Sequence, residues 1–321
     1  RTLPMMEVIA KGVARCCPNA WVINYTNPMS LCVRTLYHVF PQVRAFGCCH
    51  EVFGTQKVLV TALEEVCGIT GVSREEIEVN PVSVNHFTWL TKAQYKNMDL
   101  YPVYAEFVAR YKDTGYTKNL DNNWMNNSFA TNQRVKFDLF DRYGYIAAAG
   151  DRHLAEFCDG NWYLKDPQTV RDWGFGLTTV AHRKKDLIER QEKSRKLREG
   201  KMAVEINLSG EEGVSQMRAI LGLREPLVTN VNIPNVGQIP NLPLGAVVET
   251  NAVLRDGCLR PVFAGNVPGE FAALVQHNAE QQLQVAQGAK ERDLERVFLA
   301  FAGDAQVNLP MPEARKLFDE M

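Results

Sequence analysis

Three side chains that could take part in catalysis follow one another at Cys49, His50 and Glu51, directly after the apolar run Arg44–Gly47. A fourth, His86, stands where two β-rich runs meet. A cysteine thiolate and a neutral imidazole bind divalent transition metals, and two protein ligands leave open the positions that a catalytic metal needs. Cys49 and His86 are therefore candidate metal ligands, although their spacing alone favours a buried thiol and a core histidine. The sequence has no Cys-x-x-Cys pair, which argues against a closed structural zinc site.

Other polar residues also follow apolar or small-residue runs. Asp151 comes after three alanines and could act as a general base, although by position alone it is more typical of a helix N-cap. Asn27 lies two residues after the apolar run 21–25. Its amide could hold a sugar hydroxyl or a cofactor, or it could cap an Asx-type turn. His50 could donate a proton or orient a ligand, but a structural role is the more common one for such a histidine.

Arg152 and Arg183 are cations that could grip an anionic substrate. Arg183 belongs to the basic run 183–185, and such a run is more often a solvated helix face. No G-x-G-x-x-G turn, Walker A motif or G-x-S-x-G elbow occurs in the sequence. The chemistry of this chain is therefore not indicated by any of the common nucleotide or hydrolase signatures.

The elements that must position these residues alternate at the start of the chain. Apolar spacing predicts helices at 4–16, 29–40 and 51–67, and strands at 21–25 and 44–47. This α-β-α-β-α order predicts right-handed crossovers and a parallel sheet with its chemistry at the carboxyl ends of the strands.

The later part of the chain mixes the two kinds of element. It has β-rich runs at 77–84, 87–91, 227–233 and 246–254, and helical patterns at 101–111, 129–143, 178–199, 270–286 and 293–301. Residues 113–127 are expected to form a loop or lid, and residues 209–212 a capping box. We predict the remainder of a nucleotide-binding, Rossmann-like domain at 1–72, followed by a mixed α+β domain at 73–321. The chain begins at Arg1 inside a helical pattern, so we expect a segment to precede it.

Composition narrows the class of protein. The chain has 321 residues, of which 45% are apolar and 23% charged, and this is enough to bury a sizeable core. The formal net charge of -1 favours neither nucleic acid nor an anionic membrane as a partner. No apolar run approaches the roughly 20 residues that span a bilayer. Eight cysteines without a regular framework indicate reduced thiols and a cytoplasmic location.

Five ordered motifs together resemble glycoside hydrolase family four, and within it the bacterial α-galacturonidase branch. They are Asn-Tyr-Thr-Asn-Pro-Met (24–29), Gly-Cys-Cys-His-Glu-Val-Phe-Gly (47–54), Val-Asn-His-Phe-Thr-Trp (84–89), Ala-Gly-Asp-Arg-His-Leu-Ala-Glu-Phe (149–157) and Pro-Asn-Leu-Pro-Leu-Gly-Ala-Val-Val-Glu-Thr-Asn (240–251). The resemblance covers essentially the whole chain. It implies a fold like that of lactate and malate dehydrogenases, with residues 1–72 as the remainder of the NAD-binding domain and residues 73–321 as the α+β domain for substrate, metal and oligomerisation. It also favours functional over structural roles for Cys49, His86 and Asp151.

The resemblance also implies a route to glycoside cleavage that departs from the paired-carboxylate mechanism. NAD oxidises the hydroxyl on sugar carbon 3, a base then removes the proton on carbon 2, and a divalent metal, usually manganese, stabilises the enediolate. The aglycone leaves by elimination, water adds, and the reduced cofactor returns the hydride. In the family the dinucleotide fingerprint lies nearer the amino terminus than Arg1, so we expect it outside these residues.

Motif by motif, Cys49 and His86 match the metal ligands and Asp151 matches the base of the α-specific members. His50 matches a proton-donor position, and Asn27 an asparagine that holds the substrate near the nicotinamide. Arg152 or Arg183 could pair with a uronate carboxylate. A homodimer or homotetramer is expected, and the resting metal could be another divalent transition ion. Alternatives are an α-glucuronidase or α-galactosidase of the same family, a lactate/malate-type dehydrogenase, or an inactive fragment.

Overall fold

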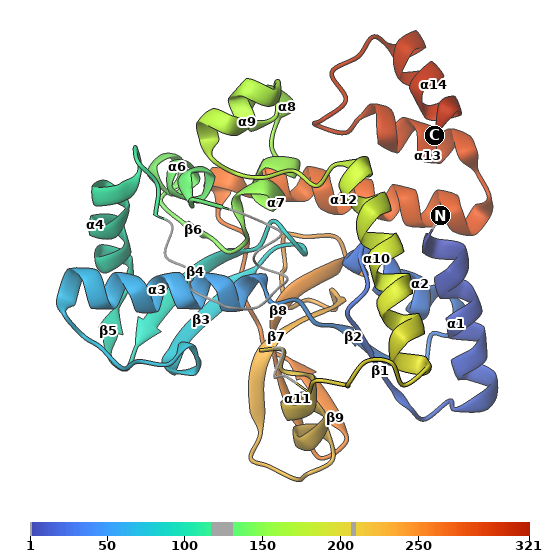
Figure 1. Ribbon diagram of the computed structural model, residues 1–321, viewed down its shortest axis with the longest axis horizontal. Coiled ribbons are helices and arrows are strands. Elements are labelled where there is room, and N and C mark those ends of the chain that lie inside the picture. Colours follow the sequence, from blue (N-terminus) through green and yellow to red (C-terminus); the bar gives the residue numbers. More distant parts are fainter. Residues whose placement is uncertain (1, 117–130, 207–209) are drawn as a thin grey trace.

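The first 67 residues alternate helices and strands (Figure 1). The structure is a computed structural model that describes residues 2–116, 131–206 and 210–321. Its first elements are α1 (Thr2–Cys16), β1 (Trp21–Asn24), α2 (Met29–Val39), β2 (Arg44–Gly47) and α3 (Glu51–Cys67). Strands β1 and β2 pair in parallel over their full lengths, which confirms the predicted parallel arrangement at this end of the chain.

A distant stretch of sequence extends this sheet on the other side of β2. It contributes β7 (Leu227–Pro234), β8 (Val247–Arg255) and β9 (Cys258–Pro261). The strand order is β1-β2-β7-β8-β9, and all pairings after β1-β2 are antiparallel. The sheet therefore contains strands from both sides of residue 72, and the division into domains at 1–72 and 73–321 stays a prediction.

A second, antiparallel sheet lies on the side of α3 (Figure 1). After the short helix η1 (Arg74–Glu76) it is built from β3 (Ile77–Val82), β4 (Trp89–Tyr95), β5 (Met98–Asp99) and β6 (Ile146–Ala147). Helices α3, α4 (Tyr101–Tyr111) and α6 (Arg134–Tyr143) bury their apolar faces together with this sheet. Among the buried side chains are Leu59, Leu63, Leu90, Tyr104, Phe107 and Phe137.

A further core lies between this sheet, the β8 strand and the helices of the carboxyl-terminal half. The helices of this core are α7 (Asp151–Glu156), α8 (Gly160–Tyr163), α9 (Pro167–Trp173) and α12 (Gly269–Glu291), whereas α13 (Leu294–Ala302) packs on α12 and α14 (Met311–Glu320) packs on α13. Trp89 of β4 is fully buried there and stacks on Phe271 of α12, with ring centroids 4.3 Å apart. The two cores hold α3, the β3–β4 connection and α7 in fixed relation to one another.

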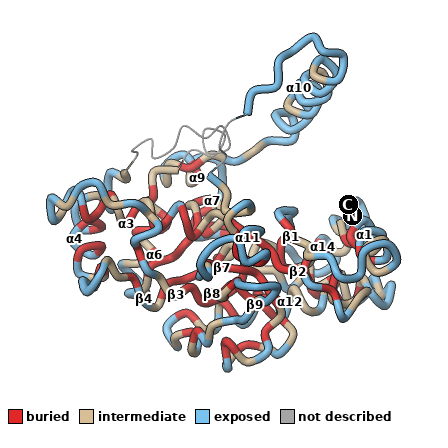
Figure 2. Tube along the Cα trace, turned by 90° about the horizontal axis from the view of Figure 1, so that it is seen from below, coloured by how far each residue is buried: buried red, intermediate tan, exposed pale blue. Residues whose placement is uncertain are grey.

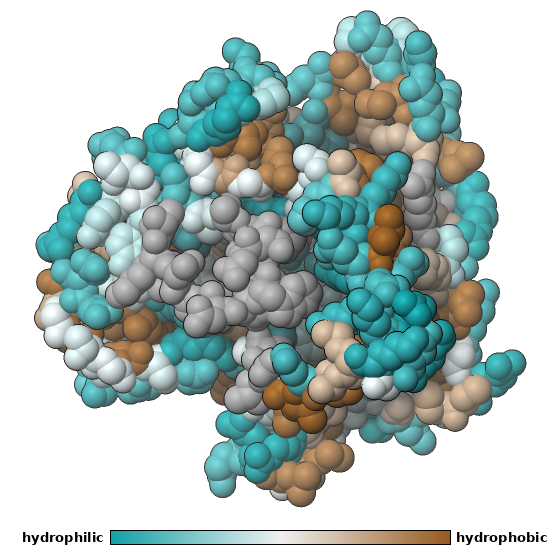
Figure 3. Space-filling model, in the orientation of Figure 1, coloured by the Kyte–Doolittle hydropathy of each residue, from teal (hydrophilic) through white to brown (hydrophobic). Residues whose placement is uncertain are grey.

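Helix α10 (Val180–Arg198) has no buried residue and stands away from the rest of the molecule (Figure 2). Figure 3 shows mainly hydrophilic residues where this helix faces the viewer. Its exposed apolar side chains include Leu187 and Ile188. The neighbouring α11 (Gly213–Ile220) packs instead on β7 and β8 through Ala219 and Ile220. None of the described helices is both long and apolar enough to span a bilayer.

The bounds of β2, α3 and α4 agree with the sequence-based ranges, and α3 ends at Gly68 in the left-handed conformation that glycine favours. Other bounds differ. The β-rich run predicted at 77–84 ends at Val82 and the next strand spans 89–95, because Ser83 and His86 between them have positive φ. The short elements β5, β9, α8, α9 and α14 were not predicted.

Two predictions fall partly outside the described residues. These are the loop or lid at 113–127 and the capping box at 209–212. Within the described part, α6 begins at Arg134 rather than at the predicted residue 129, and α11 begins at Gly213 with Glu212 as its N-cap residue.

Candidate active site

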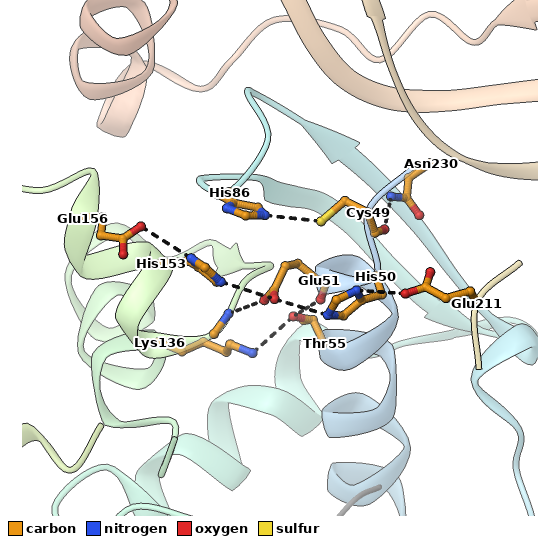
Figure 4. A network of polar contacts seen from close by, with 11 residues as sticks. Cys49, His50, Glu51, Thr55, His86, Lys136, His153, Glu156, Glu211 and Asn230 are labelled. Carbon is orange, nitrogen blue, oxygen red and sulfur yellow. Dashed lines mark hydrogen bonds and ion pairs between the residues drawn. The ribbon is translucent and has the colours of Figure 1, made fainter. Parts of the chain in front are cut away.

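Cys49 and His86 lie in connections that follow strands of two different sheets, and their side chains point toward one another (Figure 4). Cys49 lies in the turn between β2 and α3, where the Cys48 N–H donates to the Asn24 carbonyl and extends the parallel pairing by one step. His86 lies in the connection between β3 and β4. The Cys49 Sγ atom is 3.4 Å from His86 Nε2. The structure thus brings together the two residues that the sequence singled out as metal ligands.

The imidazole is in the protonation state that binds a metal, whereas the thiol must lose a proton to do so. Burial raises the pKa of the Cys49 thiol well above its usual 9.0, and the negative charges of Glu249 and Glu51 add to the rise. Burial, followed by repulsion from His153, lowers the pKa of His86 to about 4, so its imidazole is neutral at pH 7. A neutral imidazole offers its lone pair directly, and a cation bound beside the thiol would offset the cost of ionising it.

The donor set and spacing of this pair fit one divalent transition ion. With metal–sulfur and metal–nitrogen bonds of about 2.3 and 2.1 Å, two adjacent ligands of one ion lie about 3.1–3.6 Å apart, and the observed 3.4 Å is inside that range. Among the described residues, no group of three or more His, Cys, Asp or Glu side chains is arranged to hold a metal. The pair therefore suits a site that leaves coordination positions to substrate rather than a closed structural site.

Glu51, the first residue of α3, is a carboxylate surrounded by imidazoles (Figure 4). Its Oε1 atom lies 3.7 Å from Nε2 of His50 and 3.7 Å from Nε2 of His153, and its Oε2 accepts from the Gly150 N–H at 2.6 Å. Burial would raise the pKa of this carboxyl, but the three neighbouring histidines and the Gly150 N–H hold it at about 2. Glu51 stays ionised at any pH at which the protein would work.

His50 and His153 flank this carboxylate on opposite sides. His50 Nδ1 lies 3.2 Å from Glu211 Oε1, and this hydrogen bond is the main reason that the pKa of His50 is raised. The His153 ring lies against the His86 ring, with centroids 4.2 Å apart and planes inclined by 35°. His50 is thereby positioned with a raised pKa near the Cys49–His86 pair, as a proton donor would need to be.

Asp151 is fully buried at the first position of α7. It is not the N-cap residue, which is Gly150; instead, its Oδ1 atom accepts from the Lys136 N–H of α6 at 3.1 Å. Burial raises the pKa of Asp151, against the lowering effect of hydrogen bonds from Thr131 and Lys136. In the described part of the chain no hydrogen bond or ion pair joins Asp151 directly to the Cys49–His86 pair, so its role as base stays a prediction.

The predicted substrate ligands occupy two places. Asn27 is exposed and its Oδ1 accepts from the Met29 N–H at 3.1 Å, which is the Asx-type turn at the start of α2. Arg152 is half-buried and its Nη1 donates to the Thr178 hydroxyl at 2.8 Å. Burial and then the positive charge of Arg183 lower the pKa of Arg152. The two arginines are therefore close enough to sense one another's charge.

Sequence reasoning missed three residues that surround the site: Lys136, His153 and Glu249. Lys136 and Glu249 could have been found, since Lys136 is a charge on an apolar helix face and Glu249 is the one acidic residue of its strand. Glu51 was noted beside Cys49 as a possible catalytic carboxylate, and His153 belongs to a recognised motif, but neither was assigned a specific role. Their importance follows from contacts between α3 and α7.

Family models match most of the chain. The model described as "Family 4 glycosyl hydrolase" matches residues 1–65, and that described as "Family 4 glycosyl hydrolase C-terminal domain" matches residues 82–307. The candidate residues at 49–51, 86 and 151–153 fall within these matches.

Two curated relatives are similar over all of the chain. An α-galacturonidase of Thermoanaerobacterium saccharolyticum is 55% identical over 321 residues, which cover 100% of this chain and 69% of that protein. An α-galacturonidase of Bacillus subtilis is 45% identical, again over 100% of this chain and over 71% of the relative.

Solved structures agree with these matches. A Bacillus subtilis protein described as a glucosidase has a TM-score of 0.91 at 44% identity, with 99% of this chain and 72% of that chain covered. A 6-phospho-α-glucosidase from gut microorganisms, solved in complex with NAD and Mn²⁺, has a TM-score of 0.74 at 20% identity, covers 99% of this chain and 69% of its own, and supports the fold alone. The chain therefore belongs to glycosyl hydrolase family 4 and is a glycosidase.

Proposed function

We propose that this protein is an α-galacturonidase that depends on NAD and on a divalent metal, manganese or another divalent transition ion. Four relatives named α-galacturonidase, between 45 and 55% identical over all of the chain, support the substrate. The observation that carries the chemistry is the buried Cys49–His86 pair, with its sulfur and nitrogen 3.4 Å apart. Such a pair has no use in paired-carboxylate hydrolysis but suits metal-assisted elimination.

Each residue of the site has a role in this proposal. Cys49 and His86 would hold the metal, whose positive charge would stabilise negative charge on substrate oxygens, and NAD would supply reversible oxidation of the hydroxyl on sugar carbon 3. Asp151 would take the proton from carbon 2, and His50 would give a proton to the leaving oxygen. Asn27 would hold the substrate where β1 ends. No G-x-G-x-x-G turn occurs in the chain, so no residue is assigned to the cofactor's pyrophosphate.

The carboxylate of a uronide needs a cation in a partly desolvated place, where a charged hydrogen bond is worth most. Arg152 is half-buried and meets this requirement better than the basic residues of α10, which are exposed; among these, Arg183 is near enough for its charge to act on Arg152. We assign Arg152 to the uronate carboxylate and Arg183 to support of the same charge. A neutral α-galactoside lacks that carboxylate and an α-glucuronide presents it with a different hydroxyl at carbon 4, so both serve as comparison substrates.

The test is hydrolysis of an aryl α-galacturonide by reduced protein, with and without added NAD and Mn²⁺. We expect activity only with both additions, and a loss of roughly 100-fold or more in Cys49→Ser and Asp151→Ala. Cys158→Ser is the matched control, because Cys158 is also a buried free thiol but lies outside the site. Cleavage that needs neither addition, or equal loss in both cysteine variants, would rule the proposal out. Faster cleavage of the glucuronide or the galactoside would change the assigned sugar.

We also propose that the protein is cytoplasmic and forms a homodimer or homotetramer. All eight cysteines lie in the described residues and are free thiols, which supports a reducing compartment. Within the described residues, none of the side chains of α10 is buried. A helix in water normally needs tertiary packing, so another surface is expected to cover Leu187 and Ile188. Sedimentation analysis of Leu187→Ser and Ile188→Ser checks this: the wild type would sediment at two or four times the mass of one chain, and the variants would shift towards the monomer.

A further inference from the structure

The separation of Cys49 and His86 depends on how two sheets are joined. Cys49 follows β2, a strand of the five-stranded sheet, whereas His86 belongs to the connection between β3 and β4 of the four-stranded sheet. Neither residue lies inside a helix or strand. The 3.4 Å distance between sulfur and nitrogen therefore depends on residues outside these two connections, which hold them against one another.

The connection that carries His86 has an unusual backbone. Ser83 has φ of 140° and His86 has φ of 144°, values in the region that favours glycine. Side-chain-bearing residues adopt such conformations only where the surrounding structure enforces them. The segment 83–88 is thus expected to need firm anchors at both ends to keep the His86 imidazole in place.

Glu249 of β8 supplies both anchors. Its backbone N–H donates to the Ser83 carbonyl at 2.8 Å, at the start of the segment. Its Oε2 atom accepts from the Thr88 hydroxyl at 2.6 Å, at the end of the segment. Glu249 and Thr88 are both fully buried, so these hydrogen bonds are protected from competing water.

The other carboxylate oxygen of Glu249 contacts Asn230, which in turn contacts the backbone of Cys49. Its Oε1 atom accepts from the Asn230 amide at 2.7 Å, and the same amide nitrogen lies 3.2 Å from the Cys49 carbonyl oxygen (Figure 4). Burial raises the pKa of Glu249, and the hydrogen bonds from Thr88 and Asn230 oppose that rise. One buried side chain thereby links the segment of His86 with the backbone of Cys49.

We propose that Glu249 is a positioning residue, which sets the distance between the Cys49 thiol and the His86 imidazole by bridging Thr88 and Asn230. It touches neither the sulfur nor the imidazole in the contacts described above, and it acts through the backbones that carry them. Partners of this kind behind metal ligands typically change metal affinity by about 10–100-fold. This inference rests on the proposed function, since it assumes that the pair binds a metal.

The test measures binding of Co²⁺ alone, followed by its thiolate charge-transfer absorption, without substrate or NAD. Glu249→Met keeps the length of the side chain but removes both bridging hydrogen bonds, and we expect the Kd for Co²⁺ to rise about 10–100-fold. Glu249→Gln can still accept from Asn230 and can donate to the Thr88 oxygen, so its Kd is expected to stay within about threefold of the wild type. The spectrum adds a readout of sulfur coordination that overall stability does not control.

A matched control lies two residues along the same strand. Asn251 of β8 donates from its amide to the Val79 carbonyl of β3 at 2.8 Å, so it also joins the two sheets, but it has no hydrogen bond to segment 83–88 or to Asn230 in the described structure. Asn251→Leu is expected to lower Tm and leave the Kd for Co²⁺ within about threefold. Should Glu249→Met not fold, Thr88→Val removes one of the two anchors and is expected to weaken binding in the same direction.

Different results overturn different statements. If wild-type protein and Cys49→Ser bind Co²⁺ equally, the proposed metal site is wrong and the role of Glu249 falls with it. If the wild type binds through Cys49 but Glu249→Met binds as well as the wild type, only the positioning role is wrong. If Glu249→Met and Asn251→Leu weaken Co²⁺ binding equally, the cause is a general loss of structure. If Glu249→Met and Glu249→Gln weaken it equally, the cause is the lost charge rather than the lost hydrogen bonds. Either result contradicts the proposal.

Discussion

Lys136 is a buried lysine whose removal should be costly. Its side chain is 2% exposed, its ammonium donates to the Thr55 hydroxyl at 3.2 Å, and Asp151 and Glu51 are the carboxylates that favour its charged form. Burial lowers the pKa of this ammonium, and those two carboxylates oppose the effect. Lys136→Met keeps most of the volume but leaves the fully buried Asp151 without its cation.

The expected magnitude follows from that uncompensated charge. No direct ion pair joins the Lys136 ammonium to Asp151 among the contacts of the described residues. We therefore expect a loss of unfolding free energy on the order of 2–3 kcal/mol, smaller than the roughly 3–5 kcal/mol of a broken buried ion pair. At about 2–4 °C per kcal/mol, this corresponds to a fall in Tm of roughly 5–10 °C. Glu51 contributes less to the loss, because it also faces histidines and the Gly150 N–H.

The cost should depend on pH. Burial raises the native pKa of Asp151 above its usual 3.8, so between these two values the native protein binds more protons than the unfolded chain, and stability falls as pH rises through that window. Without Lys136 the native pKa rises further and the window widens. The stability difference between variant and wild type is therefore expected to be larger at pH 8 than at pH 5.

The assay is urea denaturation followed by circular dichroism at both pH values. Lys185→Met is the control, because Lys185 is 78% exposed and its nearest carboxylate, on Glu189, is 3.8 Å away, so the change should be below about 0.5 kcal/mol. The double variant Lys136→Met with Asp151→Asn should recover part of the loss. A loss under about 1 kcal/mol at pH 8, or a double variant no more stable than the single one, would refute the reasoning.

Two further predictions concern the stability of the protein at acid pH and the packing of its hydrophobic core. The pKa of Glu51 is held at about 2, below its usual 4.5, so its contribution to stability is complete above pH 4.5 and is lost as pH falls towards 2. In Glu51→Gln, the unfolding free energy should therefore fall less steeply between pH 5 and 3. A slope like that of the wild type would contradict this prediction. Trp89→Ala should lower the unfolding free energy by about 3–5 kcal/mol in urea titrations, because Trp89 is fully buried and stacks on Phe271; a loss under about 2 kcal/mol would show that the core can collapse into the space.

The local elements around the site were accessible from the sequence. β2 is bounded by a polar cluster and α3 by Gly68, and both signals act over a few residues, so the ranges Arg44–Gly47 and Glu51–Cys67 could be predicted without the fold. The residue types at Cys49 and His86 made them candidate metal ligands, because thiolates and imidazoles bind transition metals, but only the ordered motifs favoured that role over a structural one. The ordered motifs added the family.

What only the tertiary structure decided is how distant segments meet. The antiparallel addition of β7 to β2 joins residues about 180 positions apart, and no local pattern specifies such pairing. The burial of Lys136 beside Asp151, and of Glu249 between Thr88 and Asn230, follows from packing of several elements at once. A charge in an apolar stretch is visible in the sequence, but its partner is chosen by the fold, because burial obliges it to find one wherever the chain brings it.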